Sequence, residues 1–299
     1  MGIMKSSNIT IEFIKDPEKY WDIIKLMTEI WGIRDVVEIV PAHMMRAIAD
    51  NGGLVLAAYD TKGEPIGFVL GILAMNNKGK LYHYSHMLGV KKEYRGTGVA
   101  VKLKLAQRDF AIKQGLDLIM WTYDPQQGLN AKFNFTKLGV ICRKFHRNYY
   151  GILRDEINRG LVSDRFKVEW WIKSRRVVKR IEGSLPSPTM NDIKDMVKPI
   201  VKTERIAPGI RRVKEVDLTA ESDLLLVEIP ADVNKIRDYS IDLANDWRLK
   251  LRPVFETYFS KGYIAVDFIS SIEQGERRNY YILWKTSLKE VLDGELPWR

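Results

Sequence analysis

A turn with two glycines, Arg95-Gly96-Thr97-Gly98, constrains the fold of this chain more than any other feature of its sequence. It follows an apolar, strand-like run over 81–90 and precedes a segment with apolar residues at helical spacing. Glycine has no Cβ, so the backbone can bend tightly and come close to a ligand. The start of a helix offers unpaired N–H groups and a partial positive charge. The sequence therefore predicts an anion-binding turn, suited to a pyrophosphate, between a strand and a helix.

The segments around this turn alternate between strand and helix patterns. We expect strands where apolar residues alternate or form short runs between polar turns, and helices where apolar residues recur every three or four positions. In chain order the predicted elements are a strand at 9–13, helices at 20–31 and 41–49, strands at 54–59, 65–73 and 81–90, a helix from 99 to 115, a strand at 116–122, a helix at 125–138 and a strand from 140. This order predicts an α+β domain with a mixed, largely antiparallel sheet flanked by helices.

The length of 299 residues suggests two domains. We place the first at residues 1–151 and the second at 152–299, where an exposed loop at 183–189 is followed by further elements. These are a strand at 223–230, a long helix at 233–258 and a hairpin of 263–268 with 280–284. The second domain is expected to be a smaller α+β domain of open role, whether acceptor recognition, covering the site or formation of a homodimer.

Composition excludes several classes of protein. No run of about 20 apolar residues is available to span a membrane, and residues 1–7 lack the apolar part of a signal peptide, so we expect a cytoplasmic protein without a membrane partner. Cys142 is the one cysteine, which leaves no disulfide framework and no thiolate metal site; we expect it to be a small strand residue. The formal net charge of +10 suits an anionic small ligand or a nucleic acid, and does not choose between them.

The glycine turn does not fit the common nucleotide-binding patterns. A dinucleotide fingerprint needs a third glycine and an acidic residue about 20 positions later, and a P-loop ends in Gly-Lys-Ser/Thr. The turn instead resembles the acetyl-CoA signature of the GNAT acyltransferases, V-x-x-x-Y-R-G-x-G-V-A, although Lys92 stands where proline is common. The matching residues are Val90, Tyr94, Arg95, Gly96, Gly98, Val99 and Ala100.

Further segments strengthen the resemblance. Residues 130–139 are similar to a later helix of the same family, which ends in a K-L-G step before a strand. Residues 121–125, 149–151 and 163–166 resemble a longer GNAT group with a C-terminal extension, some members of which act on amino acids. The resemblance implies a GNAT-type sheet and a cosubstrate, acetyl-CoA or another acyl-CoA. It places the coenzyme against Leu88, Gly89, Val90, Arg95, Gly96, Thr97, Gly98, Val99, Ala100, Asn130 and Asn134.

The resemblance also implies direct attack of a primary amine, from an amino acid or another small amine, on the thioester. Such a reaction needs a route for the amine's proton and a donor for the departing thiolate. The family's usual tyrosine donor corresponds to Phe135, which cannot donate, so Tyr123, Asn134 or water are the alternatives. For the base we name His86 and Asp124. Their structural alternatives are a hydrogen-bonded packing histidine and a helix cap before Pro125.

Other interpretations remain open at this level. Lys102, Lys104 and Arg108 could contact coenzyme phosphates or cover a solvated helix face. Strand alternation puts His83 and His86 on opposite faces, so we expect no metal site there. The rival function is a regulatory protein on a GNAT fold, either an acyl-CoA sensor without catalysis or a nucleic-acid-binding protein. The nucleic-acid version would use aromatic and basic side chains close together in the sequence, and we favour a solvated helix face over it. These side chains are Trp170, Trp171, Lys173, Arg175, Arg176, Lys179 and Arg180.

Overall fold

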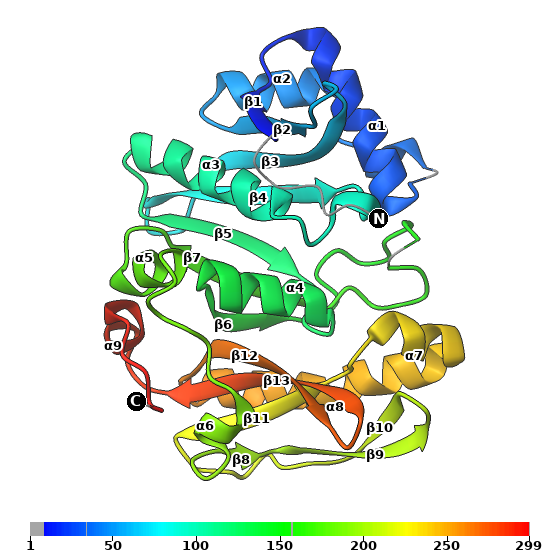
Figure 1. Ribbon diagram of the computed structural model, residues 1–299, viewed down its shortest axis with the longest axis vertical. Coiled ribbons are helices and arrows are strands. Elements are labelled where there is room, and N and C mark those ends of the chain that lie inside the picture. The colour runs from blue at the N-terminus through cyan, green and yellow to red at the C-terminus, as the bar shows by residue number, and fades with distance from the viewer. Residues whose placement is uncertain (1–8, 34, 157, 299) are drawn as a thin grey trace. The chain divides into compact units, whose positions relative to one another are not determined.

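The computed structural model describes residues 9–298 with the exception of 34 and 157. The chain forms two compact units, whose helices and strands are labelled in Figure 1. The first unit is Met1–Trp121 with Arg154–Arg159, and the second is Thr122–Leu153 with Gly160–Arg299. The first unit therefore holds the glycine turn, and the second holds the segment with the K-L-G step.

The first unit has the predicted order of strands and helices. Its elements are β1 (Thr10–Phe13), η2 (Pro17–Lys19), α1 (Tyr20–Trp31), η3 (Val36–Glu38), α2 (Ala42–Asp50), β2 (Leu54–Tyr59), β3 (Pro65–Met75), β4 (Leu81–Val90), η4 (Lys92–Tyr94), α3 (Val99–Lys113) and β5 (Leu118–Tyr123), whose last two residues belong to the second unit. The strands lie in the order β1-β2-β3-β4-β5. Every neighbouring pair is antiparallel except β4 and β5, which are parallel.

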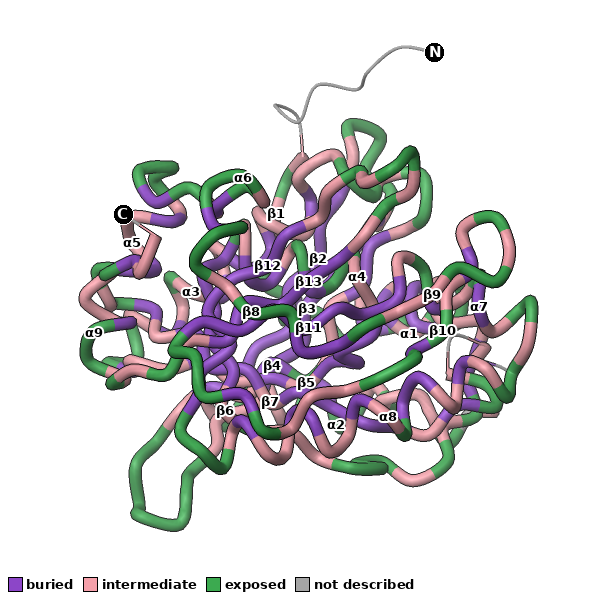
Figure 2. Tube along the Cα trace, turned by 90° about the horizontal axis from the view of Figure 1, so that it is seen from below, coloured by how far each residue is buried: buried purple, intermediate pink, exposed green. Residues whose placement is uncertain are grey.

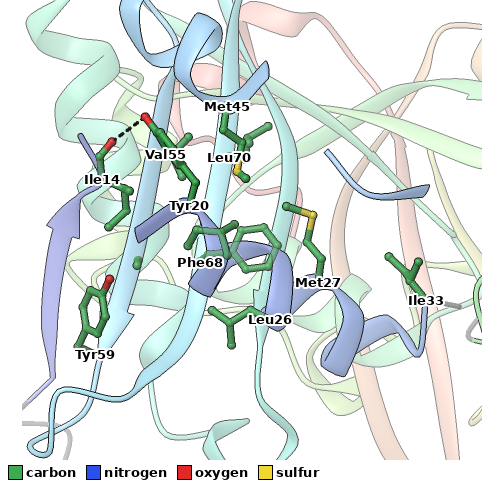
Figure 3. Packing of buried hydrophobic residues seen from close by; sticks show 12 residues of the cluster. Ile14, Tyr20, Leu26, Met27, Ile33, Met45, Val55, Tyr59, Phe68 and Leu70 are labelled. Atoms are coloured by element: carbon green, nitrogen blue, oxygen red, sulfur yellow. Dashed lines mark hydrogen bonds between the residues drawn. The ribbon is translucent and has the colours of Figure 1, made fainter. Parts of the chain in front are cut away.

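Alternating residues of β2 and β3 bury their side chains on opposite faces of this sheet, as strand geometry requires. On one face, Tyr20 of α1 and Met45 of α2 pack in a cluster with Phe68 (Figure 3). On the other face, Leu103 of α3 belongs to a cluster with Val69. Strand β2 is buried along its whole length, as the purple tube shows (Figure 2). The glycine turn and α3 are thus fixed against a rigid sheet.

The second unit is also α+β. Its elements are α4 (Gly128–Lys132), the π-helix η5 (Phe133–Leu138), β6 (Ile141–His146), β7 (Arg165–Trp171), α5 (Arg175–Ile181), α6 (Met190–Ile193), β8 (Lys198–Pro199), β9 (Val201–Ala207), β10 (Ile210–Val216), β11 (Leu224–Ile229), α7 (Val233–Tyr239), α8 (Ile241–Ser260), β12 (Tyr263–Glu273), β13 (Glu276–Lys285) and α9 (Leu288–Asp293). Strands β7-β6-β12-β13-β11-β8 are neighbours in that order, and β9 pairs with β10 separately. All these pairs are antiparallel except β11 with β8. The α+β class is therefore confirmed.

Two predicted helices differ from the structure. The helix expected over 233–258 is wrong as one element, because Ser240 leaves the helical conformation and caps α8 by accepting a hydrogen bond from the Leu243 N–H. The helix expected over 125–138 begins only at Gly128 and widens into the π-helix η5. The predicted hairpin of β12 and β13 is confirmed. Of the helices in the described parts of the chain, none has the length and apolar character needed to cross a membrane.

Candidate active site

The glycine turn is held by hydrogen bonds that run back to the preceding strand and turn. The Arg95 Nε donates to the carbonyl of Val90 (3.1 Å), and the Thr97 hydroxyl donates to the carbonyl of Tyr94 (2.7 Å). The Tyr94 hydroxyl donates to the Asp60 carboxylate (3.1 Å) in the β2–β3 turn. Contacts within the protein therefore fix the shape of the turn, and a site fixed in this way costs less entropy on binding.

Both glycines of the turn have backbone angles that residues with a Cβ rarely adopt. Gly96 has φ 80° and Gly98 has φ 95°, in the left-handed region that glycine tolerates. A Cβ built on either glycine meets no heavy atom within 4 Å, so the space beside them is open. The first intrahelical bond of α3 is donated by the Lys102 N–H to the Gly98 carbonyl (3.0 Å). The amides before it lie at a helix start, where backbone N–H groups suit an anion.

Strand β4 has a bulge at His86. The register with β3 pairs Met87 with Leu70 and Ser85 with Gly71, which leaves His86 as the extra residue. On its other side, β4 pairs with β5 only through His83–Tyr84 and Ile119–Met120 in the described residues of these two strands. A bulge interrupts the ladder and bends its strand. Between this point and the glycine turn, β4 therefore has backbone groups that are not paired with β5.

His86 is the titratable side chain at this bulge. It is solvent-exposed, and its ring lies 6.4 Å from that of Tyr84. Although the side chain reaches solvent, protein atoms around the ring replace part of its hydration, and this partial desolvation lowers its pKa below the usual value. His86 is thus neutral and able to accept a proton near pH 7. His83, in contrast, is buried and bonded to Gln107 of α3, so the two histidines do face opposite sides.

Asp124 is a candidate base from the sequence, but both of its carboxylate oxygens accept hydrogen bonds from Arg248 of α8 (3.0 and 2.6 Å). Burial opposes ionisation of Asp124, yet the charge and hydrogen bonds of Arg248 outweigh it and hold its pKa below the usual range. The alternative of a helix cap is wrong, because Asp124 accepts from the Gln126 N–H while α4 starts at Gly128. The geometry gives Asp124 a structural role within the second unit.

Tyr123 is a candidate thiolate donor from the sequence, but its hydroxyl is buried against Tyr281 of β13 (2.8 Å). The Tyr281 hydroxyl donates to the carbonyl of Pro125 (2.7 Å), and a carbonyl can only accept. Tyr123 must therefore donate to Tyr281, and burial raises the pKa of both phenols well above the usual value. The Tyr123 proton is therefore held by a hydrogen bond in the core and cannot reach a departing thiolate from there.

The remaining site predictions in the second unit fall at the α4–η5 segment. Asn130 is exposed, whereas Asn134 is buried. Phe135 is fully buried, with its ring centroid 5.6 Å from that of Tyr281. Cys142 is buried in β6, and burial raises the pKa of its thiol, as expected of an inert strand residue. In the described part of the chain no cluster of three or more histidine, cysteine or acidic side chains could hold a metal ion.

The basic and aromatic cluster proposed for nucleic acid is not a surface patch. Trp170 is fully buried and donates to the Leu138 carbonyl (2.7 Å). Arg176 is buried and donates to the carbonyls of Gly139 and Val266. Arg180 forms a buried ion pair with Asp267 (2.6 Å). Three of the side chains that would grip and stack on a nucleic acid are therefore core residues, so this rival interpretation loses its main support.

Residues 18–139 match the family model described as the acetyltransferase (GNAT) family. This region is a GNAT acetyltransferase domain. It includes the glycine turn and the segment up to the K-L-G step, and it leaves a C-terminal extension of 160 residues, from 140 to 299. Among curated proteins, none matches the sequence significantly.

Several solved structures are similar to part of the chain. The NatC complex bound to Gag peptide and CoA shares 23% identity, with 54% of this chain and 97% of that chain covered and a TM-score of 0.43. The ribosomal-protein-S18-alanine N-acetyltransferase from Escherichia coli shares 13% identity over 55% of this chain and 94% of that one, with a TM-score of 0.43. A GNAT-family N-acetyltransferase from Escherichia coli in complex with CoA shares 22% identity over 40% and 64%, with a TM-score of 0.33.

Proposed function

We propose that this GNAT domain transfers an acyl group, with acetyl-CoA as the donor, to a primary amine such as that of an amino acid or another small amine. The observation that carries the proposal is the open turn at Gly96 and Gly98, which follows strand β4 and η4 and begins a helix of 15 residues. The coenzyme pyrophosphate would lie against the amides of this turn. Leu88, Gly89 and Val90 would offer backbone groups to the pantetheine chain and the thioester.

In the reaction we propose, the amine nitrogen attacks the thioester carbonyl carbon, and the C–S bond breaks as the amide forms. A backbone N–H of β4 near the bulge would donate to the carbonyl oxygen as negative charge develops on it. His86 would take the proton that the attacking amine loses, directly or through a water. Because Tyr123 is committed to the core and Phe135 has no hydroxyl, we assign protonation of the thiolate to water.

The coenzyme site can be tested with two matched glycine substitutions at opposite ends of α3. Gly98→Trp should weaken CoA and acetyl-CoA binding by about tenfold or more, because the indole would fill the space that the pyrophosphate needs. Gly115 at the other end of the helix has φ 77° and an equally open Cβ position. Gly115→Trp should carry a similar backbone strain and leave binding unchanged in isothermal titration calorimetry.

Equal losses of affinity in the two variants would point to general destabilisation and remove the turn from the coenzyme site. If the wild-type protein binds neither acetyl-CoA nor CoA, the proposed function is wrong. Turnover can be measured as release of the free CoA thiol. Binding of acetyl-CoA without turnover of any amine in a broad screen would favour the sensor interpretation.

A further inference from the structure

A buried cluster around Lys104 lies where the pairing of β4 with β5 ends. The Lys104 Nζ donates to the Ser85 hydroxyl (2.9 Å) and to the Gln107 side-chain oxygen (2.9 Å). It also lies 3.6 Å from the ring centroid of Trp121. The exposed fractions are 1% for Lys104, 4% for Ser85 and 7% for Trp121, so water does not replace these contacts.

The positions of these partners in the sheet are specific. The last pair of the β4–β5 ladder joins Tyr84 to Met120. Ser85 and Trp121 are the next residue on each strand, and Lys104 contacts both of them. Lys104 thus joins the strands through its own side chain at the first position where their backbones no longer pair. Ser85 also directly precedes the bulged His86.

The same group fixes the orientation of its neighbours. Lysine can only donate, so the Gln107 oxygen faces Lys104, and the Gln107 Nε2 donates to the His83 Nε2 (3.1 Å). His83 is therefore the tautomer with its proton on Nδ1, an atom that is buried without a hydrogen-bond partner. Burial, with the nearby Lys104, lowers the pKa of His83 to about 3 and keeps it neutral. These hydrogen bonds thus connect Lys104 and Gln107 of α3 to His83 and Ser85, two buried residues on the same face of β4.

Burying a lysine at this position costs free energy. Burial lowers the pKa of Lys104 well below its usual value, which reflects the cost of removing its charge from water. Its neighbours on the buried side of α3 include Leu103 and Ala111, so an apolar residue would suit the surrounding core. Buried polar groups that cost stability fix one arrangement in some proteins. Here the arrangement concerned is the separation of β4 from β5.

We propose that Lys104 is a positioning residue that holds β4 and β5 at the width the acyl-CoA thioester and pantetheine require. It acts through Ser85 and Trp121 and does not touch the coenzyme. This inference rests on the proposed function for its consequence in catalysis. Its structural part, the fixed separation of the strands, can be tested without any ligand.

The test uses three variants. Lys104→Met keeps the length of the side chain and removes its donors, and should raise the CoA dissociation constant and the acetyl-CoA KM about tenfold while the acceptor KM stays unchanged. The triple variant Lys104→Met/Ser85→Ala/Gln107→Leu also removes the hydroxyl and the amide that Lys104→Met leaves unpaired. Its stability should recover in part, since the His83 Nε2 then loses its donor, but its affinity for CoA should not recover. Lys113→Met, an exposed change at the end of α3, is the control.

Hydrogen exchange of the ligand-free proteins gives the independent measurement. Peptides covering 84–88 and 119–121 should exchange about threefold faster or more in Lys104→Met than in the wild type, since the tie between the strands is lost. Recovery of CoA affinity together with stability in the triple variant would overturn the proposal, and so would unchanged exchange in these peptides. Faster exchange in a protein that binds no CoA would support the structural role of Lys104 and reject the proposed function alone.

Discussion

Replacing Arg248 by methionine should lower the free energy of unfolding by about 3–5 kcal/mol, the usual cost of breaking a buried ion pair from one side. Arg248 and Asp124 have exposed side-chain fractions of 1% and 7%, so the remaining carboxylate would lie in the core without its partner. Urea denaturation at pH 7 measures the loss. The double variant Arg248→Met/Asp124→Leu should regain most of it, because no buried charge is left.

The stability difference between the wild type and Arg248→Met should depend on pH. The lowered pKa of Asp124 in the wild type means that the pair stabilises the fold above the ordinary carboxyl pKa of about 4, and this contribution is lost as the pH falls through the lowered value. The difference in the free energy of unfolding between wild type and Arg248→Met should therefore become smaller below about pH 4. Lys289→Met, at an exposed pair with Asp293, should leave the free energy of unfolding close to that of the wild type. A loss as small as this in Arg248→Met would contradict the structural role of Asp124.

Replacing His86 by glutamine should lower kcat/KM about 100-fold, the lower end of what a general base contributes. In the wild type, kcat/KM should fall as the pH drops through the pKa of His86, which lies below the usual 6.5. The variant should lose this acidic limb. The measurement is release of free CoA from acetyl-CoA with an amine acceptor found by screening, between pH 5 and pH 8 or about that range.

His43 is a matched control, because it is an exposed histidine on α2 in the same unit. His43→Gln should keep both the rate and the pH profile of the wild type. An unchanged acidic limb in His86→Gln would show that another group accepts the proton. A 100-fold loss of CoA affinity in place of a loss of kcat would assign His86 to binding.

The sequence predicted the elements that local patterns encode. The order of strands and helices up to β6 follows from periodicity and turn residues, and the glycine turn follows from backbone angles that glycine adopts far more readily than other residues. The roles of Asp124 and Tyr123 could not be predicted in this way. Their partners, Arg248 and Tyr281, lie more than 120 residues later in the chain, and one sequence carries no signal for such pairing.

The burial of Lys104 could not be predicted from the sequence either, although its partners Ser85, Gln107 and Trp121 lie close to it in the chain. Its place in the sequence, shortly after the glycine turn, suggested a charge on a solvated helix face or against a phosphate. In the structure α3 buries a wide surface, and the position that faces β4 and β5 holds Lys104 and Gln107 in place of apolar side chains. Polar residues such as Lys104 and Gln107 have the same helical spacing whether they are buried or exposed. Periodicity alone therefore does not show that they are buried.

The π-helix Phe133–Leu138 has a consequence for how the chain can change by mutation. A π-turn adds one residue to an α-helix and rotates the residues after it. Phe135 lies within this turn, and its ring points into a closed aromatic core beside Tyr281. A tyrosine placed at position 135 would bring its hydroxyl into that core, where an unpaired polar atom is costly. A phenol at position 135 would thus need a polar partner inside this core as well as the added oxygen atom, so one substitution there does not supply a proton donor.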